Sequence, residues 1–210
     1  MGEIHFSQRL RLYLIRHGEV EGAEEGKLFG HTDVALSEQG LEQSRQLADR
    51  LASAQLSAVY TSDLQRASQA AEMIAGRHGL KVQPDAAWRE ISMGEWEGRS
   101  VAELHDQAGE KVKQLFSDPS SFKYPEGESF SVFTARIQTA LDQLLIAHPN
   151  GEIALVTHGG VCRAIIGRAL ETPMRTWIRL AQEYGCLNVI DWYELNPVLQ
   201  ILNIKLECWH

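Results

Sequence analysis

Two short motifs place a histidine and a glycine directly after an apolar run. Residues 12–19 are Leu-Tyr-Leu-Ile-Arg-His-Gly-Glu, and residues 153–160 are Ile-Ala-Leu-Val-Thr-His-Gly-Gly. Such a histidine can act as a nucleophile beside an anion, because the glycine lets backbone N–H groups approach the anion closely. The second motif also precedes a predicted helix, whose N-terminus favours negative charge. We expect His17 and His158 to face one anion-binding site.

Further residues could complete such a site. Arg66 is predicted in the first turn of a helix, where its charge opposes the helix dipole and a bidentate bond to phosphate would compensate. Glu90 follows a tryptophan in a loop rich in glycine and tryptophan, where partial burial would raise the pKa of its carboxyl and suit it to general acid catalysis. Glu95 and Glu97 are the alternatives for that acid. With Arg16, these residues indicate a bound phosphate group.

The segments around these residues alternate between predicted strands and helices. Strands are predicted over residues 11–15, 58–61, 81–83, 153–157, 187–195 and 198–206. Helices are predicted over residues 37–54, 64–77, 101–116, 128–147 and 161–170. Ser37 is expected to cap the first helix, Ser62 or Asp63 the second, and Gly79 to end the second. We therefore predict one α/β domain over residues 1–210, with residues 1–9 as a loose lead-in.

The composition narrows the function. The 210 residues are 44% hydrophobic and carry a formal net charge of −8, which argues against nucleic acid or an anionic membrane as the main partner. No apolar run approaches the roughly 20 residues of a membrane span, and no signal-peptide pattern is present. Three scattered cysteines without a CxxC pair indicate neither a disulfide framework nor a structural zinc site. We expect a cytoplasmic protein.

The motif Arg16-His17-Gly18-Glu19 resembles the signature of the histidine phosphatases, the phosphoglycerate-mutase-like superfamily. Further motifs similar to that superfamily follow in the same order, within residues 11–195: residues 30–33 with 36, 37 and 40, then 62–67, 90 with 94–98, 125–129 and 157–160. The resemblance implies a three-layer α/β/α sandwich with a central, mostly parallel sheet. It also implies a two-step phosphoryl transfer that needs no metal or other cofactor.

The resemblance implies a role for each site residue. His17 would become a phosphohistidine, while Arg16, Arg66 and His158 would bind the three phosphoryl oxygens. Glu90 would protonate the leaving oxygen and then deprotonate the attacking water. Further expected contacts to phosphate or substrate come from Gly159, Gly30 and His31, although a lone loop histidine such as His31 can equally be structural.

The sequence departs from the superfamily at Val20 and Ala23, where a hydroxyl residue and an asparagine are frequent. The stretch between Glu90 and Glu128 is shorter than in phosphoglycerate mutases, which favours a phosphatase. Residues 125–130 and 184–191 look like those of the α-ribazole phosphatases of cobalamin assembly. The expected substrate is thus a small phosphorylated metabolite, with α-ribazole 5′-phosphate first. A broad-specificity sugar or metabolite phosphatase and a phosphoglycerate mutase stay open, as do a monomer and a homodimer.

Overall fold

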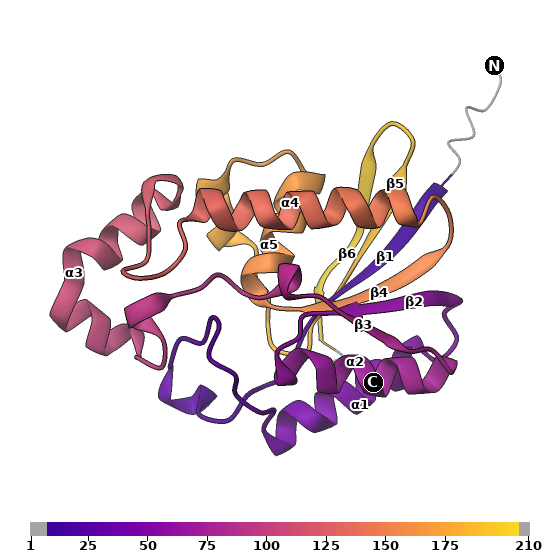
Figure 1. The fold of residues 1–210 in the computed structure, drawn as a ribbon, viewed down its shortest axis with the longest axis horizontal. Helices are drawn as coiled ribbons and strands as arrows, with labels where there is room; N and C mark the ends of the chain where they lie inside the picture. The colour runs from indigo at the N-terminus through magenta and orange to yellow at the C-terminus, as the bar shows by residue number, and fades with distance from the viewer. Residues whose placement is uncertain (1–7, 206–210) are drawn as a thin grey trace.

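A computed structural model of the chain describes residues 8–205, which form one six-stranded sheet in the order β3-β2-β4-β1-β5-β6 (Figure 1). Its strands are β1 (Gln8–Arg16), β2 (Leu56–Thr61), β3 (Val82–Pro84), β4 (Glu152–Thr157), β5 (Leu187–Tyr193) and β6 (Pro197–Ile204). The first four are parallel to one another, and only β5 runs antiparallel to its neighbours β1 and β6. The predicted mostly parallel sheet is confirmed.

Helices cover both faces of this sheet (Figure 1). One face carries α1 (Glu38–Leu51) and α2 (Gln65–His78), and the other carries α4 (Phe130–Ala147) and α5 (Gly159–Ala169). Successive side chains of β4 point to opposite faces of the sheet, as in any β-strand. Ala154 and Val156 pack in the cluster with α1 and α2, whereas Ile153 and Leu155 pack in the cluster with α4 and α5. These three layers confirm the predicted sandwich.

The start of α1 agrees with the sequence prediction, since the Ser37 side chain accepts a hydrogen bond from the Gly40 N–H at 3.1 Å. The predicted cap of α2 is wrong. Leu64 occupies the cap position without a side-chain cap, and Asp33, from the loop before α1, accepts the Gln65 N–H at 2.9 Å. The side chains proposed as caps have other partners: Asp63 forms an ion pair with Arg89, and the Ser62 hydroxyl lies 2.7 Å from Nε2 of His158. The end of α2 is as predicted, with Gly79 at φ +64°.

Several boundaries differ from the predictions. The expected lead-in over residues 1–9 is shorter, because Gln8 and Arg9 already belong to β1, and residues 1–7 lie outside the described part. Helix α5, which follows the second histidine motif, begins at Gly159 rather than at the predicted residue 161, directly after His158. The last strand ends at Ile204, and residue 206 lies outside the described part.

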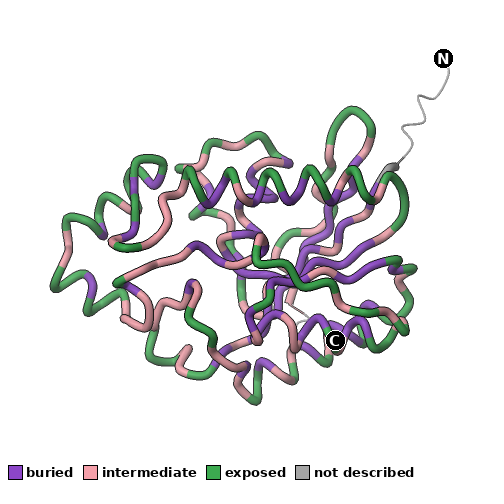
Figure 2. Tube along the Cα trace, viewed as in Figure 1, coloured by how far each residue is buried: buried purple, intermediate pink, exposed green. Residues whose placement is uncertain are grey.

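The helix α3 (Val101–Ser117) extends away from the sheet at one end of the molecule (Figure 1). It is bent at Ala108, whose φ of −145° is not helical, and only Leu104 and Val112 are buried. Figure 2 shows the contrast between this exposed helix and the buried strands. Short 3-10 helices complete the fold: Ala23–Glu25, Ala86–Trp88, Gly94–Trp96, Pro119–Ser121 and Met174–Arg179. No helix within residues 8–205 is long and apolar enough to cross a membrane.

Candidate active site

The two histidines predicted at strand ends lie side by side. β1 and β4 are neighbouring parallel strands whose register pairs Arg16 with Thr157, so that the next residue of each chain segment is a histidine. The ring centroids of His17 and His158 are 5.1 Å apart in an edge-to-face arrangement. Both side chains are buried, with 4% and 1% exposed. The strand ends therefore bring both histidines into one site, at the carboxyl edge where open α/β sheets place their ligands.

Hydrogen bonding fixes the protonation of His17. Its Nδ1 atom lies 2.7 Å from the carbonyl oxygen of Gly18. Because a carbonyl can only accept, Nδ1 carries the proton and Nε2 keeps a free lone pair. Burial, followed by the charges of Arg66 and Arg16, holds the pKa of His17 well below its usual value. His17 is therefore a neutral imidazole with Nε2 available as a nucleophile.

The loop that follows His17 is pressed against the start of α1. A Cβ atom at Gly18 would overlap the backbone of Gly40, and one at Gly40 would overlap the carbonyl of Glu19. Glu19 is bound to the same region, because its carboxylate accepts the Ser37 hydroxyl at 2.9 Å and its N–H donates to Gln43. Two glycines and one carboxylate thus hold the His17 loop in place.

His158 has one partnered and one unpartnered nitrogen. Its Nε2 lies 2.7 Å from the hydroxyl of Ser62, one of the two residues predicted to cap α2. Its Nδ1 is buried and has no hydrogen-bond partner. Burial, then the charges of Arg66, His17 and Arg16, lower the pKa of His158 well below its usual value. An unpaired buried nitrogen is costly unless a ligand satisfies it.

Arg16 has the same incomplete pairing. One terminal nitrogen donates to the Gln182 carbonyl at 2.5 Å, and the guanidinium stacks on the Tyr184 ring at 3.9 Å. Its Nε is buried without a partner. The Tyr184 ring also lies 5.6 Å from the His17 ring. A phosphoryl oxygen beside His17 could pair with this nitrogen.

Arg66 is buried, with 1% exposed, and is held by the loop that precedes α1. Its two terminal nitrogens donate to the carbonyls of Thr32 at 2.8 Å and Gly30 at 2.7 Å. Burial lowers its pKa, although the charge of Glu90 opposes this, and a guanidinium stays protonated in any case. The carbonyls compensate the charge that Arg66 adds at the start of α2.

Gly30 was expected to contact phosphate, but the structure gives both of its backbone groups other partners. Its carbonyl binds Arg66, and its N–H donates to Glu97 at 2.9 Å. A Cβ atom at Gly30 would overlap the carbonyl of Ile91. Gly30 therefore positions Arg66, and phosphate binding by its N–H finds no support in this arrangement.

Glu97, one of the alternative acids, is the anchor of that loop. Its carboxylate accepts backbone N–H groups of Gly30, His31, Thr32 and Met93 at 2.8–3.1 Å. Burial raises its pKa, but the hydrogen bonds from these residues outweigh that effect and leave the pKa below its usual value. Such a carboxylate is ionised, and each of its oxygens accepts hydrogen bonds from two backbone N–H groups.

Glu90 lies beside the second histidine motif. Its side chain is 8% exposed, with Oε1 accepting the Ile91 N–H at 2.9 Å and Oε2 accepting the Gly160 N–H at 2.7 Å. A Cβ atom at Gly160 would overlap Glu90 Oε1. The second glycine of the His-Gly-Gly motif is therefore what admits this carboxylate. Glu95, by contrast, is exposed.

The loop around Glu90 is fastened from α4 and from His31. Arg136 donates to the carbonyls of Ala87 and Arg89 at 2.8 and 2.9 Å and forms an ion pair with Glu128. His31 contacts the same loop, with Nε2 3.0 Å from the Glu90 carbonyl, to which it donates. In this arrangement His31 contacts the backbone of Glu90.

Four residues near the site were not among the predicted functional residues: Ser62, Arg136, Gly160 and Arg163. Arg163 follows Gly159 by one helical turn, and this spacing is the signal that could have found it. A Cβ atom at Gly159 would lie 3.2 Å from Arg163 and 3.5 Å from Arg16, so that the glycine separates the two guanidinium groups. Arg163 Nε donates to the Leu180 carbonyl at 2.9 Å, and burial lowers its pKa.

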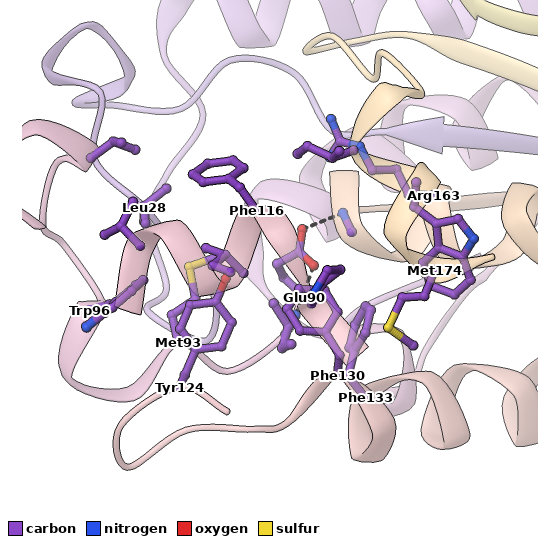
Figure 3. A pocket seen from close by; sticks show the side chains of 18 of the residues that line it. Leu28, Glu90, Met93, Trp96, Phe116, Tyr124, Phe130, Phe133, Arg163 and Met174 are labelled. Carbon is purple, nitrogen blue, oxygen red and sulfur yellow. Dashed lines mark hydrogen bonds between the residues drawn. The ribbon is translucent and has the colours of Figure 1, made fainter. Parts of the chain in front are cut away.

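An apolar cavity of about 250 Å³ adjoins Glu90 (Figure 3). Figure 3 shows Glu90 between Met93 and Tyr124 on one side and Arg163 and Met174 on the other. The site thus combines a neutral nitrogen nucleophile, two flanking arginines, a second histidine and a carboxyl group that faces an apolar space. Such a set can bind a tetrahedral anion and exchange groups at its centre.

Comparisons with known proteins agree on one superfamily. Residues 12–205 of this chain match the family described as "Histidine phosphatase superfamily (branch 1)". A protein named Probable phosphoglycerate mutase GpmB, from Proteus mirabilis, is 32% identical over 190 residues, covering 90% of this chain and 88% of that protein. The structure of the alpha-ribazole phosphatase from Shigella flexneri is similar with a TM-score of 0.84 and 28% identity, covering 92% of this chain and 96% of that chain. A mycobacterial glucosyl-3-phosphoglycerate phosphatase is similar with a TM-score of 0.85 and 25% identity, covering 95% and 100%.

Proposed function

The chain belongs to the histidine phosphatase superfamily, branch 1, and on that premise we propose that it is a phosphomonoester hydrolase that works through a phosphohistidine at His17. The observation that carries the proposal is the hydrogen bond from Nδ1 to the Gly18 carbonyl, which leaves Nε2 unprotonated among positive groups. A neutral nitrogen beside two arginines is suited to attack phosphorus, because the arginines stabilise charge on the phosphoryl oxygens.

In the first step, His17 Nε2 attacks the phosphorus and the bond from phosphorus to the ester oxygen breaks. Arg16 and Arg66 neutralise the charge on the phosphoryl oxygens, and Nδ1 of His158 donates to one of them. Glu90, in its protonated form, gives its proton to the leaving oxygen. The products are an alcohol and a phosphohistidine, with Glu90 as a carboxylate.

In the second step, a water molecule occupies the place of the alcohol. The Glu90 carboxylate takes a proton from the water while the water oxygen attacks phosphorus and the bond from phosphorus to Nε2 breaks. Inorganic phosphate leaves, and His17 returns to the neutral form with Nδ1 on the Gly18 carbonyl. Atoms and protons balance without a metal or any further group.

The proposed natural substrate is α-ribazole 5′-phosphate, hydrolysed during cobalamin biosynthesis. The likeness to the alpha-ribazole phosphatase from Shigella flexneri supports it, as do residues 125–130 and 184–191. Phosphoglycerate mutase activity is the second candidate, because the Proteus mirabilis relative is a probable phosphoglycerate mutase. The short stretch between Glu90 and Glu128 favours hydrolysis, since water must reach the phosphoenzyme.

Two measurements test the proposal. Rapid quenching at neutral or alkaline pH during turnover of 1-naphthyl phosphate is expected to trap an acid-labile phosphate on His17, absent from His17→Ala. Turnover by His17→Ala comparable to the parent would overturn the phosphohistidine. A panel containing α-ribazole 5′-phosphate, glucose 6-phosphate and 3-phosphoglycerate then tests the substrate, and formation of 2-phosphoglycerate would favour the mutase.

A further inference from the structure

The cavity beside Glu90 has walls of one chemical kind. Of the described residues that line it, only Glu90 and Arg163 carry a charge. Aliphatic, aromatic and methionine side chains form the rest of the walls, from the loop after Glu90, from α3, from the start of α4 and from residues 174–178. Tyr124 lies in one wall, and burial raises the pKa of its hydroxyl well above the usual value. A space of this kind cannot satisfy several hydroxyl groups of a bound ligand.

The cavity is continuous with the catalytic residues. Glu90 and Gly160 line it, and the same two residues are joined by the hydrogen bond from the Gly160 N–H to Glu90 Oε2. In phosphoryl transfer the nucleophile and the leaving oxygen lie on opposite sides of phosphorus. A leaving oxygen that is protonated by Glu90 must therefore lie away from His17, on the side where the cavity begins.

From this continuity we propose that the cavity binds the leaving group, and that the preferred substrates are phosphomonoesters of alcohols with an apolar, ring-sized group near the ester oxygen. This inference rests on the proposed hydrolase function and specifies its substrate class. The volume agrees with it, because an apolar cavity of about 150 Å³ holds benzene and this one, at about 250 Å³, has room for a larger group. Sugars and phosphoglycerate are disfavoured, since their hydroxyl and carboxylate groups would lose water without gaining partners.

Arg163 gives the cavity a polar end. Its Nε donates to the Leu180 carbonyl, and a terminal nitrogen lies 3.2 Å from where a Cβ of Gly159 would be, next to His158 in the chain. Figure 3 shows Arg163 at the same end of the cavity as Met174. A hydroxyl or ring oxygen close to the ester bond can accept a hydrogen bond there. The favoured alcohol is therefore amphipathic, with a polar atom next to the ester oxygen and an apolar ring beyond it.

The first test compares substrates of matched leaving ability. 1-Naphthyl and phenyl phosphate have leaving groups of similar acidity, as have 2-phenylethyl phosphate and glucose 6-phosphate. Each buried methylene-sized group contributes roughly fourfold in affinity. We expect kcat/KM to be at least about tenfold higher for the larger or more apolar member of each pair. Equal values, or a preference for glucose 6-phosphate or 3-phosphoglycerate, would overturn the inference.

The second test changes the mouth of the cavity. Ile178 lines the cavity and is 55% exposed, whereas Ile146 is 80% exposed on α4 and does not line it. Ile178→Glu is expected to raise KM for 1-naphthyl phosphate about tenfold and to reduce the preference over phenyl phosphate. Ile146→Glu, the matched control, is expected to change neither, and identical ratios in both variants would contradict the proposed subsite. Failure of the proposed function is distinguishable, because it would remove phosphohistidine formation with every ester.

Discussion

The hydroxyl of Ser62 lies 2.7 Å from Nε2 of His158, and both side chains are buried. The contact decides which nitrogen of His158 can face a phosphoryl oxygen. Nδ1 is the buried nitrogen without a partner, and it can donate only if it carries the proton. In that tautomer Nε2 accepts a hydrogen bond from the Ser62 hydroxyl, so that the serine supports the tautomer that phosphate binding needs.

Ser62→Ala is expected to lower kcat by about 5- to 150-fold, because an unpaired buried partner costs roughly 1–3 kcal/mol. Imidazole nitrogen NMR shifts of His158 are expected to move toward the Nε2-protonated tautomer. Ser62→Thr keeps the hydroxyl and should restore most of the activity. Ser44→Ala, at a buried serine that donates to the Gly40 carbonyl, is the control. An unchanged tautomer in Ser62→Ala would contradict this role.

Gly160→Ala is predicted to displace the carboxyl group of Glu90 while leaving that residue itself unchanged. The new Cβ would overlap Glu90 Oε1, so the carboxyl group must move away from the leaving oxygen. We expect kcat to fall by about 100-fold or more, within the range that general acid catalysis contributes. The loss should be smaller for esters whose alcohols leave without protonation, such as 4-nitrophenyl phosphate.

Gly76→Ala is the matched control for that variant, since nothing lies within 4 Å of a Cβ there and the residue is inside α2. It should gain about 0.5–1 kcal/mol of stability with unchanged kinetics. Equal kinetics for Gly160→Ala and Gly76→Ala would show that Glu90 tolerates displacement.

Glu97→Gln tests whether the loop over residues 30–32 positions Arg66. An amide nitrogen would face backbone N–H groups that now point at a carboxylate oxygen, which costs roughly 1–3 kcal/mol. We expect reduced thermal stability and a several-fold higher inhibition constant for inorganic phosphate. Glu95→Gln, at the exposed neighbour, should leave both unchanged. A destabilised Glu97→Gln with unaltered phosphate inhibition would mean that Arg66 does not depend on this loop.

Stability is predicted to fall on mild acidification. Burial first, and nearby positive charges second, hold the pKa of His17 and His158 well below about 6.5, the value of an unfolded histidine. Below about pH 6.5 the unfolded chain binds protons that the folded chain does not, so the free energy of unfolding decreases by up to about 1.4 kcal/mol per pH unit for each histidine.

Urea denaturation between about pH 7.5 and 5 measures that slope. His158→Gln should flatten it by about the share of one histidine. His105→Gln, at a side chain that is 65% exposed, should leave it as in the parent chain. A slope that is the same in all three proteins would assign the acid sensitivity to other groups.

The sequence carried the parts of the site that depend on local patterns. His17 and His158 each end an apolar run, and the ends of parallel strands meet at one edge of a sheet. That rule sufficed to expect them together. The predicted lead-in was too long and the predicted start of α5 too late. The first residues of β1 and the helix start behind His158 depend on pairing and packing with distant segments, which local composition does not specify.

The remaining parts depend on contacts between distant segments. Ser62 is a residue type that often caps helices, but its partner His158 is 96 residues away in the chain. Glu90, Glu95 and Glu97 occur close together in one loop region, and the sequence favoured Glu90 without showing what surrounds each carboxylate. Only the packed structure shows Glu95 exposed, Glu97 bound to backbone N–H groups and Glu90 beside Gly160.

The bent helix α3 has a consequence for protein engineering. The proposed nucleophile, the second histidine and the two arginines come from the ends of β1 and β4 and from α2. Part of the cavity wall comes instead from α3, which extends beyond the sheet. Because few of its side chains are buried, its sequence can vary with little effect on folding. Libraries that randomise this helix alone should therefore yield variants with altered ester selectivity that retain the phosphoryl-transfer step.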